Sequence, residues 1–185
     1  MRSWTRIETW LGANAPDQLA ALRGPAQGEA LRRLEHGTLL TLPSDARASY
    51  LRHDGQDPHA PAALGRWWFL QLDVALETWS RLKESQHIFD QADRGIEPVG
   101  AVRKRYWNPR WIPALADGES NFLCFDLDPA PGGRRGQLIW FQRTNRRREV
   151  VAPGLDGWLE RLGGEFERGK WLLDPEGKLV AAPPE

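Results

Sequence analysis

The sequence predicts an α+β fold in which N-terminal helices precede a mixed, mostly antiparallel sheet flanked by helices. Apolar residues recur at helical spacing through the first third of the 185 residues, whereas short β-favouring runs alternate with turn signals in the second half. With 41% hydrophobic residues, a chain of this length buries an ordinary core. We therefore expect a single domain over residues 1–185.

Four helices are expected in the N-terminal part. Trp4, Ile7 and Leu11 share one helical face, and Gly12 favours a stop after it. Glycine and proline residues recur at intervals through the following segment, which is typical of short helices joined by tight turns. The other three helices are expected over about 16–22, 27–36 and 44–53.

The remaining elements follow from the alternation of apolar runs and turns. A strand is expected at 67–70 and a helix beginning at Asp73, while 90–100 reads as a polar turn region. Pro113 favours an edge strand or a bulge. Further strands are expected at 111–115, 122–128, 137–143 and 149–152, a solvated basic turn at 144–148, a helix at about 155–166 and a hairpin formed by 171–174 and 178–180.

Charge and cysteine content exclude several classes of function. Lys+Arg and Asp+Glu number 25 each, so no overall field favours nucleic acid or an anionic membrane. No run approaches the roughly 20 apolar residues that span a bilayer. The single cysteine, Cys124, cannot form an internal disulfide. We expect a cytoplasmic protein that is a monomer or a small homo-oligomer.

Three aspartates are the main candidates for chemistry. Asp126 and Asp128 are two residues apart on an expected strand and share a face, and Asp117 lies on a nearby turn. Clustered carboxylates bind divalent cations, so a metal-dependent hydrolase is one alternative. The other is that they brace turns and accept backbone or tryptophan N–H groups. Cys124 reads as a buried apolar residue. We assign no catalytic, cofactor-binding or metal-binding residue.

A distinctive segment begins at Trp107-Asn108-Pro109-Arg110-Trp111 and continues through Asp117, Asn121, Asp126-Leu127-Asp128 and Gly136. Together with matching residues elsewhere, it resembles the SUKH superfamily over about residues 4–162. Glu119-Ser120 departs from that pattern, because many relatives have glycines there. The residues that match, taken to be mainly structural, are Trp10, Pro43, Asp54, Gly55, Trp107, Asn108, Pro109, Trp111, Asp117, Asn121, Asp126, Asp128 and Gly136.

The resemblance implies a non-enzymatic protein-binding domain with a SUKH-like fold and no cofactor. The leading expectation is an immunity protein that neutralises a cognate toxin by occluding it, and the alternative is a regulatory or scaffolding protein. Specificity is expected in the loops at 54–66, 90–106 and 129–136. The candidate partner-binding residues are Gln56, Asp57, Arg103, Arg105, Glu119, Arg134 and Arg135.

Overall fold

The computed structural model describes residues 2–183. Its N-terminal part holds four helices in the predicted order. The first runs past Gly12, because a single glycine costs a helix only about 1 kcal/mol and the following Ala15 is buried in the core. These helices are α1 (Arg2–Asn14), α2 (Pro16–Ala21), α3 (Gly28–Thr38) and α4 (Ser44–Tyr50).

A six-stranded sheet forms the centre of the fold, in the order β1-β3-β4-β5-β6-β2. Every neighbouring pair is antiparallel except β2 and β6, which confirms the predicted mixed, mostly antiparallel α+β architecture. The strands are β1 (Trp68–Phe69), β2 (Glu97–Val99), β3 (Trp111–Ala116), β4 (Phe122–Asp126), β5 (Gln137–Phe141) and β6 (Arg147–Ala152).

Strands β3 and β2 test the local sequence predictions, with different outcomes. The register of β3 against β4 shifts between Pro113 and Leu115, which confirms the predicted bulge; β3 itself is an interior strand, so the edge alternative does not apply. The prediction of a polar turn region at 90–100 is wrong. It contains a 3₁₀ helix (Asp90–Gly95) and the edge strand β2, whose short Glu97-Pro98-Val99 run has no local strand pattern.

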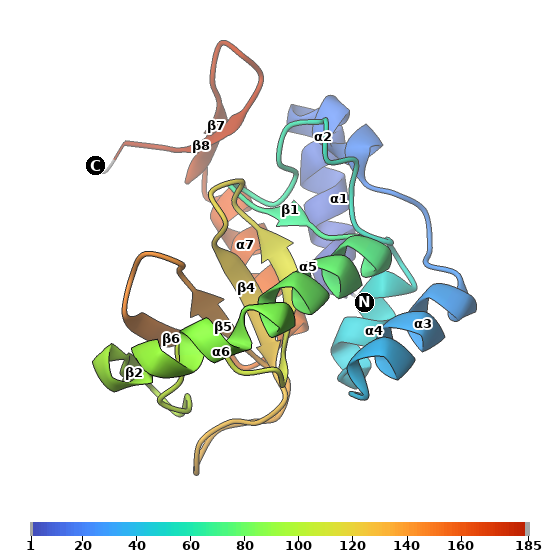
Figure 1. The fold of residues 1–185 in the computed structure, drawn as a ribbon. Coiled ribbons are helices and arrows are strands. Elements are labelled where there is room, and N and C mark those ends of the chain that lie inside the picture. Colours follow the sequence, from blue (N-terminus) through green and yellow to red (C-terminus); the bar gives the residue numbers. More distant parts are fainter. Residues whose placement is uncertain (1, 184–185) are drawn as a thin grey trace.

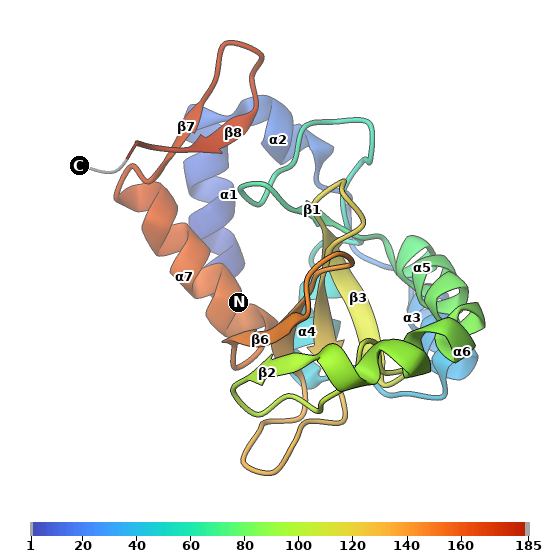
Figure 2. The same cartoon turned by 60° about the vertical axis from the view of Figure 1, so that its left-hand side comes forward.

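Helices cover both faces of the sheet (Figures 1 and 2). The helix α5 (Leu72–Glu84) and the short α6 (Gln86–Phe89) lie across one face, and α1 packs with α7 (Leu155–Glu167) on the other. A continuous apolar cluster joins these layers and includes the fully buried Trp4, Trp107 and Trp111. A separate hairpin, as predicted, is formed by β7 (Trp171–Leu173) and β8 (Leu179–Ala181).

The start of α5 depends on a residue from a distant turn. The helix begins at Leu72 and not at Asp73, because the Asp54 carboxylate accepts a hydrogen bond from the Leu72 N–H at 3.0 Å. Gly55, with φ +68°, brings this turn against the chain so closely that a Cβ would lie 2.4 Å from the Gln71 nitrogen. The Asp54-Gly55 pair is therefore structural, while Asp73 pairs with Arg33 at 3.0 Å.

Arg148 does not lie in the solvated basic turn that the sequence predicts. Strand β6 begins at Arg147, so the alternation of strand side chains turns Arg148 inward, where it is fully buried. Its guanidinium donates to the carbonyls of Tyr106 and Asn145 at 2.9 and 2.7 Å, and it lies over the rings of Tyr106 and Phe141. Burial lowers the pKa of Arg148 to about 10.

Gly136 connects the sheet to the N-terminal helices through one close contact. It has φ +92°, and a Cβ there would lie 2.5 Å from the Pro43 Cγ, on the residue that precedes α4. Gly132, in the same loop, has φ +87°, but a Cβ added there would meet no atom within 4 Å. The two glycines therefore share a backbone conformation and differ in their surroundings.

We expect Gly132→Ala to cost roughly 1–2 kcal/mol of unfolding free energy, the strain of a left-handed alanine. Gly136→Ala should cost at least about 1 kcal/mol more, because the proline ring blocks the added methyl. Urea unfolding of both variants measures the difference. Equal losses in the two variants would show that the Pro43 contact contributes nothing.

A candidate partner-binding site at the loop corner

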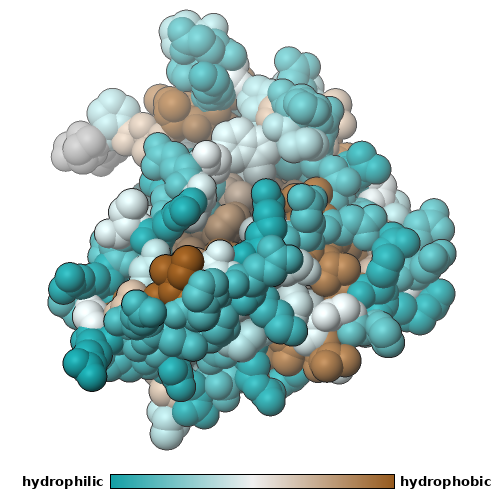
Figure 3. Space-filling view, viewed as in Figure 1, coloured by the Kyte–Doolittle hydropathy of each residue, from teal (hydrophilic) through white to brown (hydrophobic). Residues whose placement is uncertain are grey.

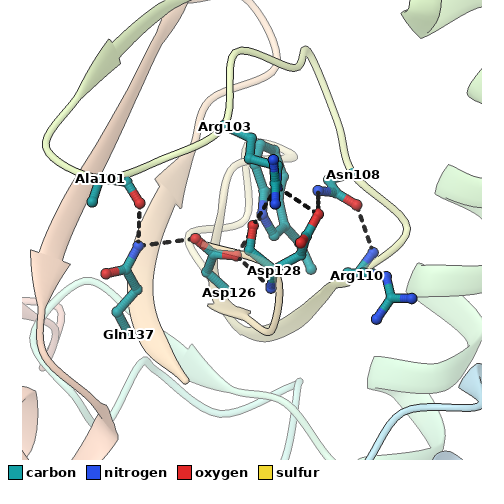
Figure 4. Close-up of polar contacts among 8 residues, drawn as sticks. Ala101, Arg103, Asn108, Arg110, Asp126, Asp128 and Gln137 are labelled. Carbon is teal, nitrogen blue, oxygen red and sulfur yellow. Dashed lines mark hydrogen bonds and ion pairs between the residues drawn. The ribbon is translucent and has the colours of Figure 1, made fainter. Parts of the chain in front are cut away.

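A buried carboxylate organises one end of the sheet (Figure 4). Asp126 ends β4, and the strand register places it beside Trp111 of β3 and Gln137 of β5. It accepts hydrogen bonds from the Trp111 indole N–H at 3.0 Å, the Asp128 backbone N–H at 3.0 Å and the Gln137 amide at 2.9 Å. Its predicted role as an acceptor of tryptophan and backbone N–H groups agrees with this geometry.

The environment of Asp126 suits a structural acceptor better than a proton shuttle. The residue has 0% exposure, and burial raises the pKa of its carboxyl, against the opposing effect of its three donors. Among the ion pairs of residues 2–183, none includes Asp126. Substrate has no access to a group whose oxygens are enclosed and occupied.

Asp128 carries the next layer of the same network (Figure 4). Its carboxylate pairs with the Arg103 guanidinium at 2.8 Å and accepts a hydrogen bond from the Asn108 amide at 3.1 Å. The Asn108 side-chain oxygen in turn accepts from the Arg110 N–H at 2.9 Å, which closes the predicted Asn108-Pro109 turn. The turn and the carboxylate therefore fix each other.

Two loops are joined through the Ala101 carbonyl. It accepts from the Gln137 amide at 2.8 Å and from the Ala130 N–H at 3.1 Å, so residues 100–110 and 127–136 hold a common position. We call the exposed surface of these loops the basic corner. It gathers four of the seven candidate partner-binding residues: Arg103, Arg105, Arg134 and Arg135.

Three of these arginines are partly anchored. Arg103 pairs with Asp128, Arg105 pairs with Asp93 at 2.6 Å, and Arg135 donates to the Thr41 carbonyl at 3.0 Å. Each retains an exposed side chain with unused donors. The corner thus presents several cationic groups on a preorganised backbone, which favours contact with an acidic surface.

The other three candidates do not belong to this corner. Gln56 is only 2% exposed, and its amide is used by Pro61 and Ala63, so it does not fit a partner-binding role. Asp57 and Glu119 are exposed. Glu119 lies in the β3–β4 turn, at the opposite end of β4 from Asp126.

The carboxylate cluster required by the hydrolase alternative does not form. Asp117 and Asp126 flank opposite ends of the β3–β4 pair, roughly 16 Å apart at the strand rise of about 3.3 Å per residue. Asp117 instead accepts from Asn121 at 2.8 Å and Arg66 at 2.9 Å. Burial raises the pKa of Asp117, but these and backbone hydrogen bonds outweigh it and lower the pKa overall. Over the described part of the chain, no three His, Cys, Asp or Glu side chains are placed to share a metal ion.

Cys124 agrees with its interpretation as a small apolar residue. It is fully buried in β4, and desolvation raises the pKa of its thiol far from the range of a reactive thiolate. Gln137 is the member of the network to which the sequence analysis assigns no role, although the run Gly136-Gln137-Leu138-Ile139 is part of the resemblance. A further signal is that Gln137 is the one polar residue in the otherwise apolar run 137–141.

Two general properties bear on what the site can contact. Within residues 2–183, none of the helices is both long and apolar enough to cross a bilayer. The face in Figure 3 is mainly hydrophilic, with hydrophobic side chains in separate patches.

Comparisons with known proteins agree with one another. A family model described as the SMI1 / KNR4 family (SUKH-1) matches residues 25–161. Similar proteins include a cell wall biosynthesis/cell cycle regulator from Schizosaccharomyces pombe, 31% identical over 98% of this chain, and a glucan synthesis regulatory protein from Neurospora crassa, 26% identical over 94%. A cell wall assembly regulator from Saccharomyces cerevisiae is 23% identical over 92%. The matches span 40–41% of the length of these relatives.

We expect Asp126→Ala to lower the unfolding free energy by about 3–4 kcal/mol, because two buried donors and one part-buried donor lose their acceptor. The matched variant Asp128→Asn, at a half-exposed position, should cost less than about 1 kcal/mol. Chemical denaturation measures both. A loss below about 1 kcal/mol for Asp126→Ala would contradict the central role of this carboxylate.

The pH dependence of stability tests the raised pKa of Asp126. A carboxyl whose pKa is raised on folding stabilises the protein most when it is protonated, and this contribution is lost as the pH rises from the ordinary value of about 3.8 through the folded pKa. The stability of the wild type relative to Asp126→Asn should therefore fall over that range. A relative stability that rises with pH would show that the three donors outweigh burial.

Proposed function

Because the chain belongs to the SMI1 / KNR4 family (SUKH-1), we propose that it is a non-enzymatic regulatory domain that binds a protein partner through the basic corner. The observation that carries this proposal is the arrangement of the loops: exposed arginines lie on two segments that hydrogen bonds join to each other. Such a surface binds without reorganising, and its partner would offer carboxylates.

The motif residues support binding over catalysis. Asp126 and Asp128 are engaged by neighbouring groups that hold the loops, and Asp117 is engaged by the β3–β4 turn. The oxygen atoms of these three carboxylates are thus already engaged in contacts within the protein. The parts left to recognise a partner are the exposed Arg134 side chain and the unused guanidinium donors of Arg103, Arg105 and Arg135.

The named relatives favour regulation over toxin neutralisation. Those from S. pombe, N. crassa and S. cerevisiae are described as regulators of the cell wall or of glucan synthesis, so the regulatory alternative is better supported than the immunity role expected from the sequence. Since this chain spans only part of their length, we carry over the binding role and not the pathway.

Charge reversal at the basic corner tests the proposal. Arg134→Glu/Arg135→Glu should weaken a captured partner's binding about tenfold or more, because two attractive contacts become repulsive. Arg168→Glu/Lys170→Glu, which makes the same charge change at exposed positions near the end of α7, is the matched control.

The partner is captured from extract of the source cells with the wild-type chain, purified, and titrated against each variant by calorimetry. If the partner binds both double variants with equal affinity, the basic corner is not the contact surface. Failure of the wild type to bind any purified candidate, or measurable substrate turnover that Asp126→Asn abolishes, would contradict the binding function itself. If the captured protein is a toxin whose activity the chain blocks, the immunity role replaces the regulatory one.

A further inference from the structure

A second site lies at the opposite end of β4 and β5 from Asp126. A pocket of about 270 Å³ opens between α5, α6 and the sheet, and its apolar lining includes Leu82, Phe89, Phe122 and Phe141. Figure 3 shows a recessed hydrophobic area ringed by hydrophilic side chains between the α5–α6 segment and the β3–β4 turn. We call this pocket the phenylalanine pocket.

Its size limits what it can hold. Pockets that enclose small-molecule ligands occupy about 300–1,000 Å³, so this one falls just below that range. A single large apolar side chain fits such a space. The aromatic lining, in which Phe122 and Phe141 stack with ring centroids 6.2 Å apart, favours an aromatic or long aliphatic group.

The rim of the pocket carries two cationic side chains, and neither forms an ion pair within the described residues. Arg81 and Arg143 both line it, and the lining contains no carboxylate. In the described part of the chain neither guanidinium forms an ion pair; Arg81 only approaches the Thr78 hydroxyl, at 3.5 Å. The two guanidiniums therefore offer free charge at the mouth of an apolar cavity.

The rim is also held in a fixed shape. Ser120 lines the pocket with φ +65°, a conformation that strains a residue other than glycine. The turn that imposes it is fixed by Asp117, which accepts hydrogen bonds from Asn121 and from the Glu119 N–H. Asn121 in turn accepts from the Arg143 N–H at 3.0 Å. The pocket is thus preformed.

The geometry points to the phenylalanine pocket as a docking site for an acidic segment of a protein partner, one that inserts a bulky apolar side chain flanked by carboxylates. The apolar lining takes the side chain, and Arg81 and Arg143 take the carboxylates through charge-assisted hydrogen bonds. This rests on the proposed protein-binding function and adds a second contact, which uses none of the four arginines of the basic corner and borders its 100–110 loop where Phe89 stacks on Tyr106.

Capped tripeptides test the site by NMR titration of the full chain. Acetyl-Glu-Phe-Glu-amide should shift the amide signals of Ser85 and Ser120 and the Arg81 Nε signal, with saturation on the order of 1 mM. Acetyl-Glu-Ala-Glu-amide and acetyl-Lys-Phe-Lys-amide remove the side chain and the charge respectively, and each should bind at least tenfold more weakly.

Variants assign the binding to the rim. Arg81→Gln/Arg143→Gln, at exposed positions, should keep the wild-type melting temperature and weaken binding of the acidic peptide about tenfold. Arg168→Gln/Lys170→Gln removes the same charge elsewhere and should leave binding unchanged. No saturable shift at the pocket, equal binding of the lysine peptide, or equal loss in both double variants would overturn the proposal. Because the basic corner is untouched in these variants, partner capture that persists separates failure of this site from failure of the proposed function.

Discussion

The fold depends on one buried carboxylate that joins three parts of the chain. Asp126 receives donors from β3, from the residue two positions after it and from β5, and so fixes the ends of three adjacent strand segments. Buried charge is costly unless its hydrogen bonds are complete. Here the strand register places two of the donors, Trp111 and Gln137, beside the carboxylate, and the turn that follows β4 supplies the third. Because the strand ends are fixed, the loops that follow them are held in place as well.

That arrangement separates the roles of buried and exposed polar residues. The recognisable residues, including Asn108, Asp126 and Asp128, face each other and set the shape of the corner. The neighbouring arginines reach outward from it. A family that shares the inner set can therefore change the outer set without changing the fold. This division is consistent with a binding domain, in which specificity resides in side chains that the scaffold leaves free.

Local chemistry determines the parts of the structure that could be predicted from the sequence. Helical spacing located α1 and α7, turn residues separated the strands, and the Asn108-Pro109 turn formed as expected. The sequence did not predict the positions of residues whose burial or pairing depends on tertiary contacts. Arg148 lies inside the protein because β6 begins at Arg147, two residues before the predicted start, and β2 forms only by pairing with β6. Gln56 follows a turn, yet packing encloses it. Asp117 and Asp126 are close in sequence but are held apart by the hairpin that joins them.

The central claim is that the Asp126 network couples the two loops of the basic corner. Amide hydrogen exchange in Gln137→Leu, which removes the bond to Asp126 and the bond to the Ala101 carbonyl, tests it most directly. We expect faster exchange at Ala130, whose N–H bonds to the Ala101 carbonyl, and at Asp128, whose N–H bonds to Asp126, with unchanged exchange at Asp174 in the β7–β8 hairpin. Unchanged protection at Ala130 and Asp128, or a uniform increase that includes Asp174, would contradict the claim.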